Sequence, residues 1–352
     1  MVETGLIILA SLILWIPQIS YGASLEEVVK ILERLPKEVR LEKIIEGARQ
    51  EKELLIYTST QAEETQKRVE FFKRKYPFIV EAKFYRSSHH KLLTRMMMEY
   101  RAKRYYADVV NINGDIIYLA KKEGLVGGYF PLESGAFPKG FKDSGGYWTA
   151  LNIRPYVLEY NTRLVIPEDL PRKLGDLLNE KWRGRLALDD REYTWFANLL
   201  KVFGEKDGIE FMKRLARQDI SLRSGHTLLS QLVAAGEFPI NVVQYAHVTE
   251  RSKRSGAPVD WVGMDPIITD FNSIALTRYP LHPYSAMLFI EYMLSEEGQK
   301  LLIRDRGLIP ARSNIEPDPP LTKGLELVPV DLQLMDGIQR HTQLFQQIFL
   351  RK

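Results

Sequence analysis

ELLIYTST (Glu53–Thr60), IVEAKF (Ile79–Phe84) and ADVVNI (Ala107–Ile112) are the three stretches of sequence that decide the fold. Each contains a short apolar or alternating run of the kind that forms a strand. Between them lie two segments with helical periodicity, one that ends near Pro77 and one that begins after Ser88. Strands that alternate with helices at this spacing predict an α/β fold with a mostly parallel sheet.

Polar residues follow each of these three predicted strands. Ser59 and Thr60 follow the first, Ser87 and Ser88 the second, and Asn113 the third. Ligands of parallel sheets bind beyond the carboxyl ends of the strands, where helices also begin. Hydroxyl groups and the N–H groups of helix starts favour anions. These serines, Thr60 and Asn113 are therefore candidate ligand-binding residues.

The middle of the chain repeats the strand–helix pattern. Separate short strands are predicted at 148–151, 156–160, 185–189, 241–245, 259–262 and 272–277. One long helix is predicted over 283–304, and a last amphipathic helix over about 331–349. A chain of 352 residues is long enough for two such α/β lobes.

Residues 1–23 are predicted to be a signal peptide. Gly5–Ile19 is almost entirely apolar, is shorter than a bilayer span and is followed by small residues. Glu3 in place of a basic residue keeps an uncleaved anchor, or a different start codon, open as alternatives. Because the chain has no cysteine, neither a disulfide nor a lipid-modified cysteine can form. We therefore expect a periplasmic or secreted protein rather than a lipoprotein.

Composition and motifs argue against several classes of function. The formal net charge is +4, and the charges are interspersed without a long basic run, so nucleic acid is not an expected partner. Neither a Gly-rich nucleotide-binding motif, nor a catalytic serine motif, nor a zinc-protease motif occurs. We therefore predict no enzyme activity, no cofactor and no metal site.

Four local features have both a chemical and a structural interpretation. His89-His90 and Asp189-Asp190 are possible metal or acid–base groups, but a helix start and a strand-end turn are the favoured interpretations. Ser224-Gly225-His226 precedes an apolar helix and is favoured as its N-cap. Met96-Met97-Met98 is favoured as core packing.

Several stretches of sequence carry a family resemblance, in the following order. They are EGARQEKELLIYTST (46–60), FFKRKYPFIVEAKFYRSS (71–88), LLTRMMMEYRAKRYYADVV (92–110), LEYNTRLVIPEDLPRKLGDLLNEKWRGRLALDD (158–190), LLSQLVAAGEFPINVVQYAH (228–247) and AMLFIEYMLSEEGQKLLIRDRGLIPAR (286–312). Together they resemble the iron(III)-type extracellular solute-binding proteins of ABC importers, which have the type II periplasmic-binding-protein fold.

The resemblance implies two α/β lobes that are joined by crossover strands and close on a ligand like a hinge. The implied lobe 1 is residues 51–149 with 265–312, and lobe 2 is residues 150–264. N-terminal helices (24–50) precede the lobes, and a Pro-rich connector with a C-terminal helix (313–352) follows them.

The resemblance also implies where the ligand binds. Iron-binding members use a histidine, a carboxylate and two adjacent tyrosines, and here the matching residues are Gln61, Asn113, Tyr245 and Ala246. Fe(III) prefers anionic oxygen ligands, so these replacements weaken the case for iron. Arg154 matches an arginine that contacts the anion bound beside the iron, and it can grip a carboxylate or phosphate bidentately.

Three further candidates lie in the predicted second lobe. Tyr193 and Tyr245 offer aromatic walls and hydroxyl groups, and Ser224 offers a hydroxyl group next to the helix-start N–H of Gly225. The predicted function is that of a monomeric binding protein that holds a small anionic or polar organic ligand and delivers it to the permease of an ABC importer. The alternatives are an iron(III) or iron-complex binder, an enzyme on this fold and an exported sensor.

Overall fold

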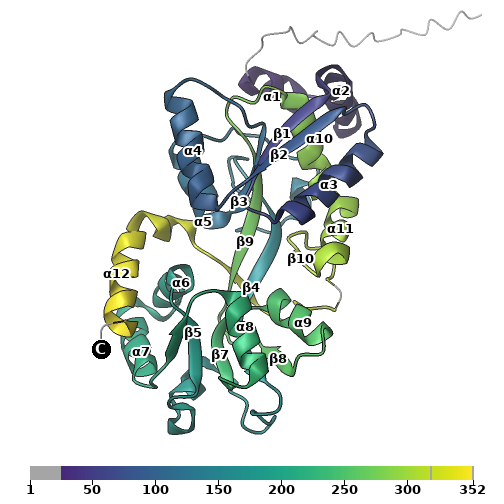
Figure 1. Ribbon diagram of the computed structural model, residues 1–352. Helices are drawn as coiled ribbons and strands as arrows, with labels where there is room; N and C mark the ends of the chain where they lie inside the picture. The colour runs from purple at the N-terminus through teal and green to yellow at the C-terminus, as the bar shows by residue number, and fades with distance from the viewer. Residues whose placement is uncertain (1–24, 318, 351–352) are drawn as a thin grey trace, which may run out of the picture.

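The computed structural model describes residues 25–317 and 319–350. Figure 1 shows two lobes joined by two long strands, β4 (Thr149–Asn161) and β9 (Ile267–Leu276). This is the predicted two-lobed α/β fold. The predicted signal peptide lies outside the described residues. Among the helices of the described residues, none has the length and apolar character needed to cross a membrane.

One mixed sheet runs through both lobes, in the strand order β2-β1-β3-β9-β4-β7-β5-β6. The strands of lobe 1 are β1 (Glu53–Thr58), β2 (Glu81–Arg86) and β3 (Val109–Asn113), with the short strands β10 (Ile309–Pro310) and β11 (Leu327–Pro329) at its border. Those of lobe 2 are β5 (Leu186–Asp189), β6 (Ser221–Arg223), β7 (Ile240–Tyr245) and β8 (Val259–Val262). Within each lobe β1, β2 and β3, and likewise β5, β6 and β7, pair in parallel, as predicted.

Strand β4 corrects the prediction of two separate strands at 148–151 and 156–160. It is continuous, and it changes partners part-way along its length: Thr149–Pro155 pair with β9, whereas Tyr156–Asn161 pair with β7 and β8. Proline is normally a strand breaker, but Pro155 lies where the partner changes, so the strand passes from lobe 1 into lobe 2 without a break.

Strand β9 begins five positions before the predicted strand 272–277, and all ten of its residues are buried. It pairs with β3 on one side and β4 on the other, both antiparallel. A strand that is covered on both faces needs no alternation of polar and apolar residues, and Thr269, Asp270, Asn272 and Ser273 are buried inside it. Thr269 and Asp270 lie in the first half of the strand and hid it from a search for apolar runs.

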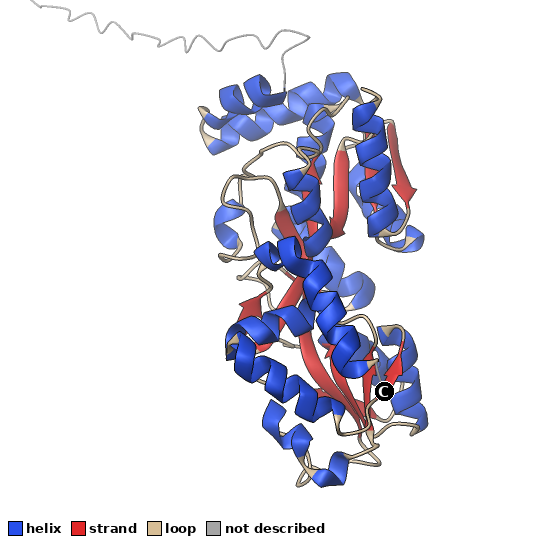
Figure 2. Ribbon diagram, turned by 90° about the vertical axis from the view of Figure 1, so that its left-hand side faces the viewer, coloured by secondary structure: helices blue, strands red, loops and turns tan. Residues whose placement is uncertain are grey.

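Helices cover the strands on either side in both lobes (Figure 2). In lobe 1 and its N-terminal extension they are α1 (Leu25–Glu33), α2 (Lys37–Glu51), α3 (Ala62–Lys75), α4 (His89–Arg101), α5 (Gly114–Lys122), the 3₁₀ helix η1 (Ser134–Ala136), α10 (Pro283–Leu294) and α11 (Glu296–Arg306). In lobe 2 they are the 3₁₀ helices η2 (Leu174–Leu178) and η3 (Glu180–Trp182), then α6 (Tyr193–Phe203), α7 (Glu205–Ala216), α8 (His226–Ala235) and α9 (Ala246–Arg254). The C-terminal segment forms the 3₁₀ helix η4 (Leu332–Gly337) and then α12 (Ile338–Phe349).

The long helix predicted over 283–304 is two helices. Ser295 interrupts it in an extended conformation, and its hydroxyl group accepts a hydrogen bond from the N–H of Gly298 at the start of α11. Likewise, the helix predicted over 331–349 begins as the 3₁₀ helix η4 and becomes α-helical only at Ile338.

A tight packing contact under the crossover strand gives the first prediction. Gly114 begins α5, and a Cβ atom there would lie 2.7 Å from the ring of Phe271 on β9. That ring is fully buried and is stacked on Trp148 at 4.8 Å. We expect Gly114→Ala to lower the free energy of unfolding by about 1–3 kcal/mol through overpacking, as measured by urea denaturation.

Gly175→Ala is the matched control, because nothing lies within 4 Å of the Cβ position of Gly175. Its free energy of unfolding should stay within about 0.5 kcal/mol of wild type. Equal stability of the two variants would contradict the packing described for Phe271.

Candidate ligand-binding site

The predicted residues of lobe 1 lie together at one edge of its sheet. Strands β1, β2 and β3 are parallel, and Thr58 is in register with Arg86 on one side and with Asn111 on the other. The loops after these strands, which carry Ser59, Thr60, Ser87 and Ser88, therefore leave the sheet on the same side, next to Asn113.

Several of these lobe 1 groups are already hydrogen-bonded within the protein. The hydroxyl group of Thr60 donates to Oδ1 of Asn111 over 2.9 Å, and Asn113 Oδ1 accepts from Asn272 over 3.4 Å. The N–H of Ser59 donates to the carbonyl of Asn111. Asn111 thus accepts hydrogen bonds from both Ser59 and Thr60 at this edge of the sheet. The sequence did not indicate this role, because Asn111 lies inside a predicted strand. Ser88 is the N-cap of α4, and its side chain makes no capping hydrogen bond.

Arg154 lies where the two crossover strands run side by side. Its register partner on β9 is Asp270, and Nη2 of Arg154 donates to that carboxylate over 2.6 Å and to the carbonyl of Phe271 over 3.1 Å. The guanidinium carbon lies 5.1 Å from the centre of the Tyr245 ring. Nε of Arg154 is buried, and among the described residues it has no hydrogen-bond partner.

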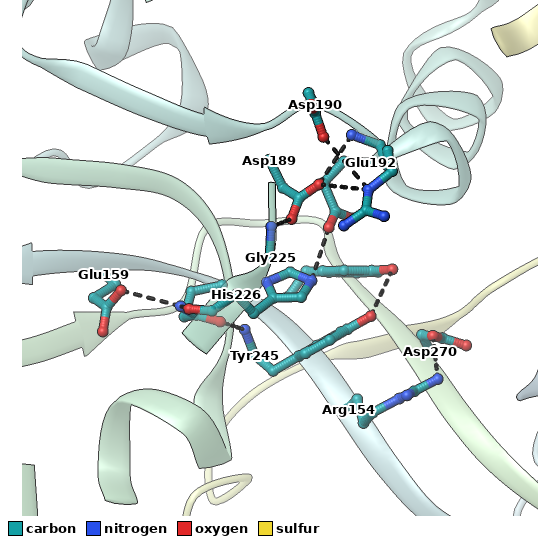
Figure 3. A network of polar contacts seen from close by, with 12 residues as sticks. Arg154, Glu159, Asp189, Asp190, Glu192, Gly225, His226, Tyr245 and Asp270 are labelled. Carbon is teal, nitrogen blue, oxygen red and sulfur yellow. Dashed lines mark hydrogen bonds and ion pairs between the residues drawn. The ribbon is translucent and has the colours of Figure 1, made fainter. Parts of the chain in front are cut away.

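Tyr245, at the end of β7, is in contact with a second tyrosine that the sequence did not reveal. The ring of Tyr156, from β4, stacks on it at 5.1 Å, and the two hydroxyl oxygens lie 3.5 Å apart. The ring of His226 lies on the same tyrosine, with ring centres 4.1 Å apart (Figure 3). A second phenol therefore lies beside Tyr245, and it comes from the neighbouring strand β4 instead of from position 246.

Carboxylates surround the start of α8 (Figure 3). Asp189 accepts a hydrogen bond from the N–H of Gly225 over 2.5 Å, and Asp190 accepts one from the hydroxyl of Ser224 over 2.6 Å. Glu192 and Nε2 of His226 are 2.8 Å apart. The predicted donors Ser224 and Gly225 thus contact the protein's own carboxylates in this structure.

Burial and neighbouring charges shift the pKa values of the carboxylates and the histidine at the start of α8. Asp189 and Glu192 are only 3% and 6% exposed. Burial and repulsion from Glu192 raise the pKa of Asp189. Burial acts to lower the pKa of His226, but Glu192 and Asp189 outweigh it, so that pKa is raised. The neighbouring carboxylates therefore stabilise the protonated form of His226.

The same three residues have the geometry of a cation site. One ligand atom from each of Asp189, Glu192 and His226 lies within 4.8 Å of the other two. Two carboxylates and one imidazole suit a transition-metal ion better than Mg²⁺ or Ca²⁺. The sequence interpretation of Asp189-Asp190 as a turn missed this geometry, because Glu192 and His226 come from two different helix starts.

Three other sequence features can now be placed. The ring of Tyr193 packs edge-on against Phe345 of α12, 5.3 Å away, so its aromatic face contacts the C-terminal helix. His89, the first residue of α4, has its pKa lowered to about 4 by burial and by His90 and Arg154. Of the three methionines, Met96 is buried and Met98 is exposed, so only part of that run is core.

Comparison with known proteins identifies the family. The family described as "Bacterial extracellular solute-binding protein" matches residues 106–333, which include both crossover strands and all of lobe 2. The chain belongs to this family. Its members are substrate-binding proteins rather than enzymes as a class.

Two curated relatives match parts of this solute-binding protein. An uncharacterized protein of Haemophilus influenzae is 26% identical over 140 residues, which is 38% of this chain. The Fe(3+)-binding periplasmic protein of Serratia marcescens is 22% identical over 172 residues, which is 46% of this chain. The matched segments span only 40% and 51% of those relatives' own lengths.

Solved structures have the same fold over most of both chains. IdiA (FutA) from Trichodesmium, in complex with iron and citrate, superimposes with a TM-score of 0.74 at 17% identity and covers 85% of this chain and 100% of its own. AfuA from Actinobacillus pleuropneumoniae, with fructose-6-phosphate bound, gives a TM-score of 0.69 at 22% identity, covering 85% and 99%. These likenesses establish the type II periplasmic-binding-protein fold.

The second prediction concerns the His226–Glu192 pair. Glu192→Gln removes the carboxylate that raises the pKa of His226, so that pKa should fall, as followed by NMR titration of the imidazole. A raised pKa in the folded state stabilises the fold below the histidine's unfolded pKa of about 6.5, and this contribution disappears as the pH rises through the folded pKa. The difference in free energy of unfolding between wild type and Glu192→Gln should therefore be larger at pH 6 than at pH 8.

Glu237→Gln is the control, since it breaks an exposed ion pair with Arg223 in the same lobe. It should leave the His226 titration unchanged. An unaltered titration in Glu192→Gln would show that Glu192 does not set the charge of His226.

Proposed function

We propose that this protein is the solute-binding component of an ABC importer and that it binds a small anionic or polar organic molecule between its two lobes. In this proposal the chain is periplasmic or secreted, acts without catalysis and delivers its ligand to a membrane permease. Membership in the extracellular solute-binding family supports this role. The residues of the site narrow the class of ligand.

The observation that carries the proposal is the environment of Arg154. Its side chain is 14% exposed and lies beside a tyrosine ring, and its buried Nε has no partner in the described structure, so the guanidinium is suited to receive an anion. Asp270 keeps the pKa of Arg154 above its ordinary value despite the burial, which acts to lower it. The positive charge is therefore permanent, and an anionic group of the ligand finds it preformed.

The carboxylates of lobe 2 suit the hydrogen-bond donors of the ligand, whereas Arg154 suits its anionic group. Asp189 already accepts the N–H of Gly225 at the start of α8, so an anion there would face a carboxylate instead of free N–H groups. Asp189 and Glu192 instead offer hydrogen-bond acceptors to hydroxyl or amino groups. A small molecule with one anionic group and several hydroxyl or amino groups would satisfy Arg154 and these carboxylates together.

A structural relative is consistent with this class of ligand. AfuA from A. pleuropneumoniae was solved with fructose-6-phosphate, which is a hydroxylated anion. Fructose 6-phosphate is therefore a reasonable first probe. Citrate is a second, since it accompanies iron in the Trichodesmium structure.

The third prediction tests Arg154 with a charge-conserving change. Removing the charge would leave Asp270 buried without its partner, at a cost of about 3–5 kcal/mol, and the variant could fail to fold. Arg154→Lys keeps a cation beside Asp270 but loses the bidentate guanidinium. We expect affinity for fructose 6-phosphate or citrate, measured by calorimetry, to fall about tenfold or more while unliganded thermal stability changes little.

Arg183→Lys is the matched control, because Arg183 is an exposed arginine that pairs with Glu180 and Asp219 on lobe 2. Its affinity should equal that of wild type. Equal binding by Arg154→Lys and wild type would remove Arg154 from the site, and an absence of binding by wild type would count against both probes. Native mass spectrometry of protein from its own cells would then show which ligand is retained.

Iron(III) is a second candidate because of two observations. The hydroxyl oxygens of Tyr156 and Tyr245 are 3.5 Å apart, and Asp189, Glu192 and His226 have the geometry of a cation site. The pKa of both tyrosines is nevertheless raised, chiefly by burial, although Arg154 opposes the shift at Tyr245. Phenolate ligands would therefore have to form against an unfavourable environment.

The fourth prediction separates the two candidates by absorbance. Since an organic anion is the preferred ligand, adding ferric citrate should produce no visible phenolate-to-iron charge-transfer band. If a band does appear, it should weaken in Tyr156→Phe and in Tyr245→Phe, and iron would then replace the organic anion as the ligand. Tyr279→Phe, an exposed tyrosine of lobe 1, is the control for nonspecific colour.

A further inference from the structure

The C-terminal segment runs from the crossover strands to both lobes. Strand β11 pairs in parallel with β9, and the N–H of Val330 donates to the carbonyl of Thr269. Figure 1 shows the yellow chain then passing close to α5 before α12 descends beside α6 and α7. We call residues 331–349 the C-terminal strap.

The strap is firmly attached to lobe 2. Phe345 is fully buried, and its ring packs edge-on against Tyr193 and Phe196 of α6, at 5.3 and 5.5 Å. Asp331 pairs with Lys201, and its N–H donates to Asn198 over 2.8 Å. Buried aromatic contacts and a hydrogen bond therefore make α12 part of lobe 2.

The strap also reaches lobe 1, where η4, with its buried Met335, lies against α5 and the ion pair between them is exposed. Asp336 lies 2.7 Å from Nζ of Lys122 and 3.1 Å from the hydroxyl group of Tyr118, both on α5. The side chains of Lys122 and Asp336 are 52% and 50% exposed. An exposed ion pair of this kind is weak and is screened by salt. The strap is thus held to lobe 2 by buried aromatic rings, whereas its ion pair with lobe 1 is easily broken.

The two helices that the strap connects both begin at the candidate site. Asn113 is the N-cap of α5 and is followed closely by Asp115. Burial raises the pKa of Asp115, whereas the charge of Arg154 acts to lower it. Glu192 is the N-cap of α6, and the next residue is Tyr193, which contacts Phe345. A rotation of the lobes about β4 and β9 would therefore change the separation of α5 and α6 at the strap.

We propose that the C-terminal strap is a latch, in which the Asp336 contacts with Lys122 and Tyr118 hold lobe 1 in the orientation seen here and must be remade or broken when the lobes rotate. The latch rests on the proposed function only in assuming that the lobes move. Because the latch acts on the unliganded protein, it changes the fraction of unliganded molecules whose lobes are in the orientation that binds ligand.

The experiment measures the distance between the lobes without any ligand. The chain has no cysteine, so spin labels can be placed at Glu70→Cys on α3 and Glu210→Cys on α7, both exposed, and distances read by pulsed EPR. The quantity compared is the number of molecules that show the main wild-type distance, divided by the number that show any other distance. In Asp336→Asn and in Lys122→Gln this ratio should fall about two- to fivefold at low salt, the range expected when an exposed ion pair is lost. Wild type should approach the variants in 1 M salt.

Two further variants make the test specific. Arg340→Gln breaks an equally exposed pair with Glu205, but both partners lie in the lobe 2 assembly, so the distances should match wild type. The charge swap of Lys122→Asp with Asp336→Lys should restore the wild-type distribution. Distances in Asp336→Asn and Lys122→Gln that equal those of Arg340→Gln would overturn the latch, whatever ligand the protein binds. Failure of the Arg154→Lys test would leave this comparison untouched.

Discussion

Arg154 on β4 and Asp270 on β9 form a buried ion pair between the only two strands that cross the described protein from lobe to lobe, and the candidate site is built around it. The two residues are register partners, so the pair favours one alignment of the crossing strands. Either charge alone would be costly to bury, since removal of one partner of such a pair costs about 3–5 kcal/mol. Because the same guanidinium lies over Tyr245 of lobe 2, a single positive charge contacts both the crossing strands and the candidate site.

Around this charge the two lobes contribute different chemistry. Lobe 1 presents hydroxyl and amide groups at the carboxyl ends of parallel strands, and Asn111 orders several of them by hydrogen bonds. Lobe 2 presents two buried carboxylates, a histidine and stacked tyrosines. In the proposed function, a ligand that joins the lobes would contact the guanidinium of Arg154 with an anionic group and the carboxylates near the start of α8 with hydrogen-bond donors.

The fold could be predicted from the sequence because strands and helices leave local patterns of apolar residues. Much of the candidate site was missed because its residues are far apart in the sequence and meet only in the folded chain. Apolar runs and helical periodicity identified most strands and helices, and the loops after β1, β2 and β3 were rightly expected to share one edge. The errors lie where local patterns mislead: β4, which contains Pro155, was predicted as two strands, and buried polar residues concealed the first half of β9. Tyr156 and Glu192 could not be found, since their partners Tyr245 and His226 are distant in sequence and only the sheet order brings them together.

The second phenol from β4 makes iron a candidate ligand again, and the charges of the site bear on the choice between iron and an organic anion. Fe(III) gains most from ligands that are already anionic, but Tyr156 and Tyr245 are buried with raised pKa values and would each have to release a proton. Arg154 makes deprotonation of Tyr245 easier, yet the same positive charge would repel the incoming cation unless an anion entered with it. An organic anion needs no such proton release, because the guanidinium is charged beforehand and Asp189 and Glu192 can accept hydrogen bonds from the remaining hydroxyl or amino groups. The raised tyrosine pKa values and the charged guanidinium are the reasons that the proposal prefers an organic ligand, whereas Asp189, Glu192 and His226 have the geometry of a metal site.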